Sequence, residues 1–483
     1  MHATLKPIAG GQAQLKPIAG GQAQPVEQAL YEIRKKIYPR AVTGTFALAR
    51  WFFVWATQLV FYGLPWLAWN DRQAVLFDLV HRKFYIVGLV FWPQDIFYLT
   101  VLLIISAYSL FLFTAVAGRL WCGFACPQTV YTEIFMWIEK VIEGDRLKRM
   151  KLDGARLSAR KFALKAAKHG AWIALALWTG FTFVGYFTPI RELGAEVLAL
   201  GLGPWETFWI LFYGFATYGN AGWMREQVCK YMCPYARFQS VMFDPDTLII
   251  TYDRERGEPR GARARSADRK GRNLGDCVDC GICVQVCPTG IDIRQGLQYE
   301  CIGCAACIDG CDRVMDKMGY PKGLIRYASE HALKERLGFV GMVRRVLRPR
   351  VLVYTAILWA IILAAAFALY QREPVKVDVI RDRIAGVRED EDEVENIYRL
   401  QIMNTSEMAR RFQISASGID GLELEGGEKS VEVGPASSRM IPVRLEAPRA
   451  QVSKGANPIV FTVRTTGERD AIVITEKASF VLQ

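Results

Sequence analysis

All twelve cysteines of this 483-residue chain fall into four short motifs. Two of the motifs have the spacing C-x2-C-x2-C-x3-C, the first over Cys277–Cys287 and the second over Cys301–Cys311. Two-residue gaps in a tight loop bring three thiolates around one iron-sulfur core, and in two-cluster ferredoxins the fourth cysteine of each run binds the other cluster. The spacing therefore predicts two 4Fe-4S clusters, one held by Cys277, Cys280, Cys283 and Cys311 and the other by Cys301, Cys304, Cys307 and Cys287.

A zinc ribbon is the alternative for such runs, because paired CxxC motifs also bind zinc. It accounts for two cysteine pairs in each site but not for three cysteines in register followed by a fourth. The second run has Asp312 where the first has Pro288, which puts the local turn geometry in question but removes no ligand.

The other four cysteines form two CxxxCP pairs that flank apolar segments, Cys122 with Cys126 and Cys229 with Cys233. Residues four apart share one face of a helix, so each pair can present two thiols to one spot. Small residues that pack between helices are the structural alternative. A soft-metal site for copper as Cu(I), a dithiol/disulfide relay and ligation of a third cluster are the functional ones, and softness favours copper.

Other redox cofactors lack the residues that would hold them. The chain has four histidines, and neither His81 nor His169 has a partner ligand at its own membrane level, as a haem between helices would require. There is no GxGxxG motif after a strand and no P-loop, so nothing indicates a bound nicotinamide, flavin or nucleotide. Electrons must come from another protein or from a quinol.

The elements that position these cysteines include long apolar segments, in a chain that is 52% hydrophobic. Each is near the ~20 residues that a bilayer core requires. The segments are Phe46–Trp69, Ile96–Gly118, Gly170–Phe187, Trp205–Gly222 and Val351–Tyr370. A further stretch, Phe84–Trp92, is too short to cross and is predicted to be interfacial or re-entrant.

Basic residues give the orientation, because Lys- and Arg-rich connections stay in the cytoplasm. Residues 138–170 hold ten Lys or Arg, whereas residues 70–95 hold three and residues 189–204 hold one. This predicts a cytoplasmic N-terminus, a cytoplasmic cluster-binding segment and a periplasmic C-terminus. Most of the net charge of +12 comes from the basic connections that set this topology. No nucleic-acid partner is therefore predicted.

The rest of the chain divides by composition. Residues 1–45, which repeat LKPIAGGQAQ, are predicted to be a disordered cytoplasmic tail. Residues 374–483 show short alternating apolar segments separated by turn residues, which predicts an antiparallel sandwich. The predicted protein is multi-domain: an α-helical membrane bundle of about five transmembrane helices with an inserted two-cluster ferredoxin domain and a C-terminal all-β immunoglobulin-like sandwich. Its parts are the tail 1–45, a four-helix membrane domain 46–222, the ferredoxin domain 223–350, the fifth helix 351–370 and the sandwich 374–483.

The chain also resembles the CcoG/FixG family of membrane polyferredoxins. The resemblance covers nearly everything after about residue 40, but not the duplicated N-terminus. It is carried by FWPQD at 91–95, GRLWCGFACPQTVYTE at 118–133, EQVCKYMCPYARFQSVMFD at 226–244, GDCVDCGICVQVCPTGIDIR at 275–294 and YECIGCAACIDGCD at 299–312.

This resemblance implies a cupric reductase, with copper as substrate or transient ligand, that supplies Cu(I) for assembly of cbb(3)-type cytochrome c oxidases in the bacterial inner membrane. The implied copper site is Cys122, Cys126, Cys229 and Cys233, and the implied partners are copper chaperones or oxidase assembly factors. The electron donor and the oligomeric state, a homo-oligomer included, stay open. Two other functions are consistent with the residues: a quinol-linked subunit of a respiratory reductase, and a non-redox assembly scaffold.

Overall fold

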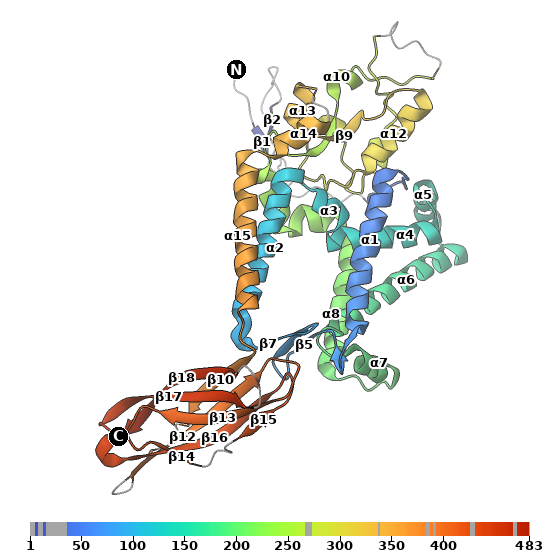
Figure 1. Cartoon of the computed structure of the whole chain (residues 1–483). Coiled ribbons are helices and arrows are strands. Elements are labelled where there is room, and N and C mark those ends of the chain that lie inside the picture. Colours follow the sequence, from blue (N-terminus) through green and yellow to red (C-terminus); the bar gives the residue numbers. More distant parts are fainter. Residues whose placement is uncertain are drawn as a thin grey trace. The chain divides into compact units, whose positions relative to one another are not determined.

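The computed structural model describes residues 5–7, 13–15, 36–265, 273–336, 339–382, 387–389, 393–425, 430–466 and 471–482. The chain forms two compact units (Figure 1). Unit 1 comprises residues 1–63, 103–184 and 197–360, and unit 2 comprises residues 64–102, 185–196 and 361–483. Most of the predicted N-terminal tail lies outside the described residues; within it, β1 (Leu5–Pro7) pairs with β2 (Ala13–Leu15).

The C-terminal part of unit 2 is a sandwich of two antiparallel sheets, whose strands alternate buried and exposed side chains. One sheet has the order β10-β12-β16-β14, with β11 also paired to β12, and the other has the order β15-β13-β17-β18. Tyr398, Phe412, Phe461 and Phe480 fill the space between the sheets. The strands are β10 (Val375–Arg381), β11 (Val387–Glu389), β12 (Glu393–Asn404), β13 (Arg410–Ser417), β14 (Glu423–Glu425), β15 (Val431–Val433), β16 (Ser438–Pro448), β17 (Gly455–Thr466) and β18 (Val473–Leu482).

The remainder of unit 2 comes from two connections between helices. Residues 64–95 form η1 (Leu64–Trp66), β3 (Ala68–Trp69), β4 (Arg72–Gln73), β5 (Val75–Asp78), β6 (Lys83–Ile86), β7 (Leu89–Phe91) and η2 (Pro93–Asp95). The second connection includes α7 (Ile190–Leu198). The amide of Phe77 donates to the carbonyl of Tyr186 at 2.7 Å, which joins the two connections. Most of the stretch Phe84–Trp92, which was predicted to be interfacial or re-entrant, forms β6 and β7 of the β5-β6-β7 sheet.

Two helices of the described chain are long and apolar enough to cross a membrane, the segments Pro93–Ala117 and Pro349–Tyr370. They contain α2 (Ile96–Ala117) and α15 (Pro349–Tyr370). The helices run antiparallel, because Tyr98 donates to the carbonyl of Ala368 at 3.0 Å while the rings of Tyr108 and Tyr354 meet at 6.0 Å. Figure 1 shows them side by side.

About five spanning helices were predicted, whereas two helices of the described chain are candidates by length and hydropathy. Helices do form in the other three segments, as α1 (Thr45–Gly63), α6 (Ala159–Val184) and α8 (Pro204–Thr217). None of them meets the length and hydropathy that a span requires. The reasons are visible in the sequence: α1 carries Arg50 and Gln58, α6 begins with a basic stretch, and α8 has only 14 residues before the π-helical η3 (Tyr218–Met224).

Unit 1 also holds α3 (Leu120–Phe124), α4 (Pro127–Glu143) and α5 (Arg146–Gly154). A buried ion network joins α4 to its neighbours, because Glu139 pairs with Arg149 at 2.8 Å and with Arg225 at 2.9 Å. Burial opposes ionisation of Glu139, but the three cations around it, Arg225, Arg149 and Lys168, hold its pKa below the ordinary value. The network fixes α4, which carries several residues of the site described below.

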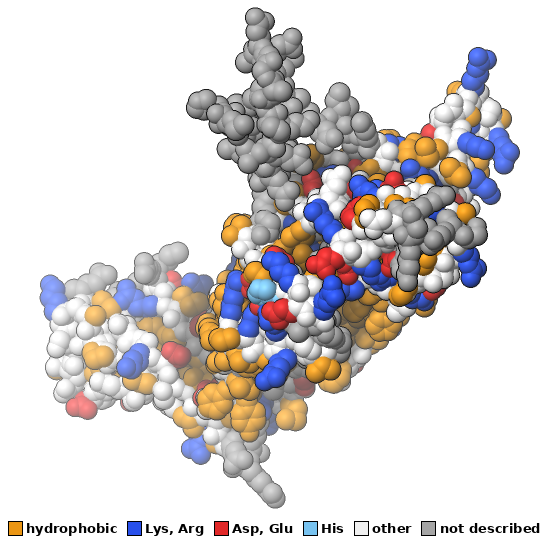
Figure 2. Space-filling view, turned by 90° about the horizontal axis from the view of Figure 1, so that it is seen from above, with side chains coloured by type: hydrophobic (Ala, Val, Ile, Leu, Met, Phe, Trp, Pro, Cys, Tyr) orange, Lys and Arg blue, Asp and Glu red, His pale blue; other side chains and the backbone are white. Residues whose placement is uncertain are grey.

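The cluster-binding segment of unit 1 is built around short helices rather than a large apolar core. Its elements are η4 (Val228–Met232), α9 (Pro234–Met242), β8 (Ile249–Tyr252), α10 (Arg254–Gly257), α11 (Ile282–Gln285), η5 (Ile293–Gln295), α12 (Ala306–Met318), β9 (Ile325–Ala328), α13 (Glu330–Lys334) and α14 (Phe339–Val346). Strands β8 and β9 pair antiparallel. Figure 2, which looks onto the molecule from above, shows Lys and Arg side chains spread over this face among acidic ones.

Candidate redox site

The two ferredoxin runs adopt the same backbone turn, offset by 24 residues. Asp279 and Gly281 flank Cys280 with φ of 50° and 63°, and Gly303 and Ala305 flank Cys304 with φ of 70° and 58°. Left-handed backbone on both sides of the middle cysteine curls each loop around the space next to it, which is unfavourable for a residue with a Cβ such as Ala305. The repeat of this turn indicates two equivalent binding loops.

Each predicted ligand set lines one cavity. Cys277, Cys280, Cys283 and Cys311 line the first. Cys287, Cys301, Cys304 and Cys307 line the second, together with Cys283. The fourth cysteine of each run thus lies with the three of the other run, as the crossed ligation of two-cluster ferredoxins requires.

The chemistry of these cavities fits a cluster. Burial raises the pKa of Cys283 to about 11 and that of Cys301 to about 12, so thiolates form there only when a metal displaces the protons. Among the described residues, no three His, Cys, Asp or Glu side chains are grouped closely enough to hold a single metal ion. A cubane spreads its thiolates around four irons, and at least four cysteines line each cavity.

The difference between Pro288 and Asp312 has a structural consequence. In the first run the helix α11 ends at Gln285, before Cys287 and Pro288. In the second run α12 continues through Cys311 to Met318, and Asp312 accepts a hydrogen bond from the amide of Gly323 at 2.9 Å. Aspartate at this position therefore lengthens the helix without moving a cysteine out of the cavity.

The two CxxxCP pairs do not share one helical face, contrary to the prediction. Cys122 lies in α3, whereas Cys126 is the N-cap of α4 and Pro127 is its first residue. In the same way Cys229 lies in η4, and Cys233 is the N-cap of α9. Proline favours the first position of a helix and cannot continue the preceding one, so each CP dipeptide starts a new helix.

The four thiols of Cys122, Cys126, Cys229 and Cys233, here called the four-thiol group, nevertheless lie near enough to influence one another, although no three of them are close enough together to hold a metal ion without moving. Burial raises the pKa of Cys122 to about 11 and that of Cys229 to about 12, and Cys126 and Cys233 add to both shifts. Cys122 and Cys229 pack against the apolar cluster that contains Cys304, with Cys307 at its edge. The four-thiol group therefore adjoins the second ferredoxin run.

The contact between these two sites is backbone against backbone. A Cβ at Gly123, in α3, would lie 2.6 Å from the carbonyl oxygen of Gly303. Arg119, one turn before Cys122, donates to the carbonyls of Tyr299 and Cys301 at 2.6 and 3.3 Å. The guanidinium of Arg119 also counters part of the rise that burial causes in the pKa of Cys122 and Cys301.

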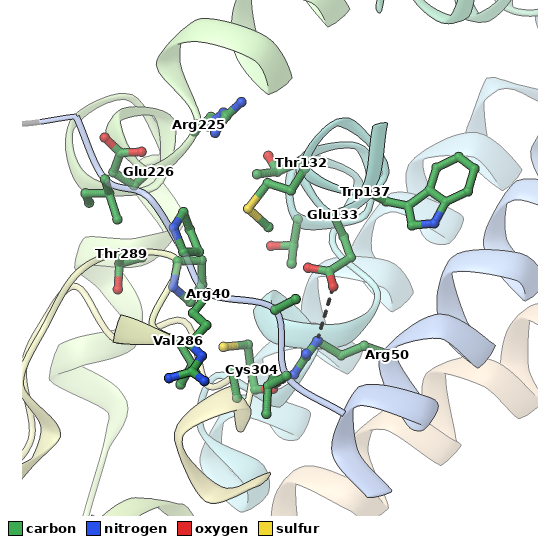
Figure 3. A pocket seen from close by; sticks show the side chains of 18 of the residues that line it. Arg40, Arg50, Thr132, Glu133, Trp137, Arg225, Glu226, Val286, Thr289 and Cys304 are labelled. Atoms are coloured by element: carbon green, nitrogen blue, oxygen red, sulfur yellow. Dashed lines mark hydrogen bonds and ion pairs between the residues drawn. The ribbon is translucent and has the colours of Figure 1, made fainter. Parts of the chain in front are cut away.

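Arg50 and Glu133 are further residues of this region that the cysteine spacing did not reveal. Arg50, in α1, donates to the carbonyl of Cys304 at 2.5 Å and lies 3.9 Å from Glu133 of α4 (Figure 3). A cavity of about 140 Å³ beside them is lined by both Cys229 and Cys304. Arg119 and Glu133 lie in the segment 118–133, which also contains Cys122 and Cys126. Their closeness in sequence to these two cysteines is the signal that could have identified them.

Comparisons with known proteins cover most of the chain. Residues 224–330 match a 4Fe-4S dicluster domain, residues 99–144 match a 4Fe-4S binding domain, and residues 365–483 match the immunoglobulin-like fold at the C-terminus of FixG. A crystal structure of a FixG-related protein from Vibrio parahaemolyticus aligns over 23% of this chain and 100% of its own at 22% identity, with a TM-score of 0.19.

Two of the curated relatives match this chain over most of its length, and a third matches it over less than half. Nitrogen fixation protein FixG of Rhizobium meliloti is 38% identical over 459 residues, which are 87% of each chain. Protein RdxA of Cereibacter sphaeroides is 38% identical over 88% of this chain and 92% of its own. The ferredoxin-type protein NapH of Haemophilus influenzae is 25% identical over 44% of this chain and 66% of its own. This chain, with its two 4Fe-4S clusters and its immunoglobulin-like C-terminal domain, belongs to the CcoG/FixG family of iron-sulfur electron-transfer proteins.

Proposed function

We propose that this iron-sulfur protein reduces Cu(II) to Cu(I) at the four-thiol group, with electrons that reach it through the clusters. The observation that carries the proposal is the packing of Cys122 and Cys229 against the apolar cluster that contains Cys304. A one-electron carrier directly beside a sulfur-rich site suits a one-electron reduction. Thiolates also prefer the product, Cu(I), over Cu(II).

The proposed ligands of the clusters are Cys277, Cys280, Cys283 and Cys311 for the first, and Cys301, Cys304, Cys307 and Cys287 for the second. The cavities that these two sets line support the assignment. When bound, the clusters accept and release one electron each.

The residues of the chain itself have three tasks in this reaction. The four-thiol group binds copper and releases protons as it does so, because buried thiols are protonated before a metal arrives. Arg119 spans from Cys301 towards the four-thiol group and holds the two sites together. Gln239, fully buried, accepts a weak hydrogen bond from the thiol of Cys122 at 3.6 Å and fixes its position.

The second candidate function involves a third iron-sulfur cluster bound by the four-thiol group. It is favoured by the match of residues 99–144 to a 4Fe-4S binding domain. It would make the chain an electron carrier with three clusters rather than a metal reductase. A quinol-linked respiratory subunit and a non-redox scaffold remain the other two alternatives.

We further propose that the protein lies in the bacterial inner membrane, with the ferredoxin segment in the cytoplasm and the sandwich in the periplasm. A crossing at α15 alone separates these two parts of the chain, whatever the other helices do. Of the connections with few basic residues, all of 70–95 and the first half of 189–204, residues 189–196, belong to the same unit as the sandwich. The partners proposed are copper chaperones or factors that assemble cbb(3)-type oxidases.

Anaerobic titration of the dithionite-reduced protein with Cu(II) tests the reaction. Cluster oxidation and Cu(I) formation, followed together, should proceed with one cupric ion reduced for each cluster oxidised. Cluster oxidation without Cu(I), or no oxidation on adding Cu(II), would leave the four-thiol group without this function and favour an electron carrier or a scaffold.

A further inference from the structure

The cavity of about 140 Å³ beside Cys304 is also lined by Cys229 of the four-thiol group, so it touches both proposed redox sites. Its walls include Trp51 of α1 and Met136 of α4. Thr132, Glu133 and Trp137 of α4 also line it and are labelled in Figure 3. It lies wholly within unit 1. A cavity that touches a proposed cluster ligand is where a small electron donor would meet the redox chain.

The volume limits what the cavity can hold. An engineered apolar cavity of ~150 Å³ accommodates one benzene ring. The space here is of the same size, so it takes a single six-membered ring and not a dinucleotide. About half of its lining residues are apolar, and the others include five Lys or Arg and three Asp or Glu, so a ligand with polar groups can be oriented there.

The polar groups suit a ring that carries hydroxyls. The carboxylate of Glu133 points into the cavity towards Arg50, at 3.9 Å, which is longer than a hydrogen bond (Figure 3). A hydroxyl between them can donate to Glu133 and accept from Arg50. The hydroxyl of Thr132 donates to the carbonyl of Gln128 at 2.6 Å and accepts a long hydrogen bond from the Gln128 side-chain amide at 3.4 Å, which leaves its oxygen one further lone pair as an acceptor.

The surroundings of the cavity are apolar on the outside of the molecule. Trp51 packs edge to face on Trp137, with ring centroids 6.2 Å apart, and Trp137 is half exposed. On the outer side of α1, Leu48, Phe52 and Trp55 are 74%, 68% and 62% exposed. Exposed apolar side chains in such numbers mark a surface that meets lipid or a partner.

We propose that the cavity binds the ring of a membrane quinol, which supplies the electrons for the clusters. The quinol is oxidised to the quinone and releases two electrons and two protons. Each of the two clusters takes one electron, the first proton goes to the carboxylate of Glu133, and the second leaves to solvent. One quinol therefore supports the reduction of two cupric ions. This inference rests on the proposed ligation of a cluster by Cys304, but not on copper.

The test uses the anaerobically purified full chain and decylubiquinol as the probe, without copper. Bleaching of the cluster absorbance reports reduction. The parent protein should be reduced by the quinol. Glu133→Gln, which keeps the cavity but removes the proton acceptor, should slow the reduction by ~10²-fold, the usual contribution of a general base. Thr132→Phe, which fills the cavity, should abolish it.

Dithionite, which needs no binding site, should reduce the clusters of all variants equally. Glu330→Gln is the matched control, because Glu330 is an exposed residue of α13 paired with Lys334. Clusters of the parent that dithionite reduces but decylubiquinol does not would overturn the quinol site. Reduction of both cavity variants at the parent rate would overturn it as well. Either result leaves the copper titration, in which dithionite is the donor, to decide the proposed function separately.

Discussion

At the scale of single residues, the two cluster cavities differ in the buried positive charge that lies beside them. Arg50 and Arg119 are 6% and 7% exposed, and both donate to carbonyls of the second run. Near the first cavity, Arg294 is held by two carboxylates, Asp292 at 2.7 Å and Asp279 at 2.5 Å. Positive charge and hydrogen bonds near a cluster favour its reduced form. The cluster beside the four-thiol group should therefore have the higher potential, which directs electrons towards copper.

Replacing Arg50 tests this charge difference. Arg50→Gln should lower the midpoint potential of one cluster and leave the other unchanged. Loss of ~1.4 kcal/mol, about one hydrogen bond from a charged group, corresponds to roughly 60 mV for a one-electron couple. Potentiometric titration followed by EPR measures both potentials. Arg336→Gln, at a side chain that is 84% exposed, is the control and should shift neither. An equal shift of both clusters in Arg50→Gln would contradict a local effect.

Iron content tests the proposed ligands. Anaerobically purified protein should hold about eight irons per chain, the content of two 4Fe-4S clusters. Cys280→Ser should remove or weaken the first cluster, and Cys304→Ser the second. EPR of the two variants should show the loss of different signals. About twelve irons, eight of which survive when the four-thiol group is replaced, would instead assign a third cluster to that group.

At the scale of elements, the closest packing in the site is α3 against the second ferredoxin loop. Gly123 permits it, because an added Cβ would meet the backbone of Gly303 at 2.6 Å and of Cys304 at 2.8 Å. This approach keeps Cys122 beside the cluster-binding loop. No similar restraint acts on Gly170 in α6, where an added Cβ meets nothing within 4 Å.

Gly123→Ala should therefore push α3 away from the loop. Overpacking costs about 1–3 kcal/mol of stability, and the iron content should fall with it. The matched substitution Gly170→Ala should leave the iron content unchanged and stabilise its helix by up to ~1 kcal/mol. Thermal unfolding and iron analysis of both variants measure the difference. A Gly123→Ala variant with parental stability and iron would show that the contact is dispensable.

Local sequence rules explain which elements could be predicted. Cysteine spacing and the alternation of apolar residues predicted the cluster-binding loops and the C-terminal strands, because both depend on near neighbours. The shared helical face of Cys122 and Cys126 was a wrong prediction, since the proline after each second cysteine starts a new helix. Arg50 could not be found from spacing, because it reaches Cys304 over 254 residues of chain.

At the scale of the whole molecule, the arrangement in the membrane depends on how many helices cross it. Five crossings were predicted, whereas two helices of the described chain are long and apolar enough. With either five or two crossings, α15 is a spanning helix, and it lies in the chain between the ferredoxin segment and the sandwich. Reporter fusions at residues 260 and 420 should therefore give opposite compartment signals, with the first in the cytoplasm, because basic connections are retained there. Equal signals would rule out a crossing at α15.

Reduction of Cu(II) by a protein without the four-thiol group tests the central claim most directly. In the variant with Cys122, Cys126, Cys229 and Cys233 all replaced by serine, both clusters should still assemble, since their eight cysteines are unchanged. We expect dithionite to reduce these clusters as in the parent, while the rate of their oxidation by Cu(II) and the yield of bound Cu(I) fall at least ~10-fold, because serine offers no soft ligand. If the variant forms Cu(I) at the parent rate, the four thiols only pack between helices, and copper meets the electrons elsewhere.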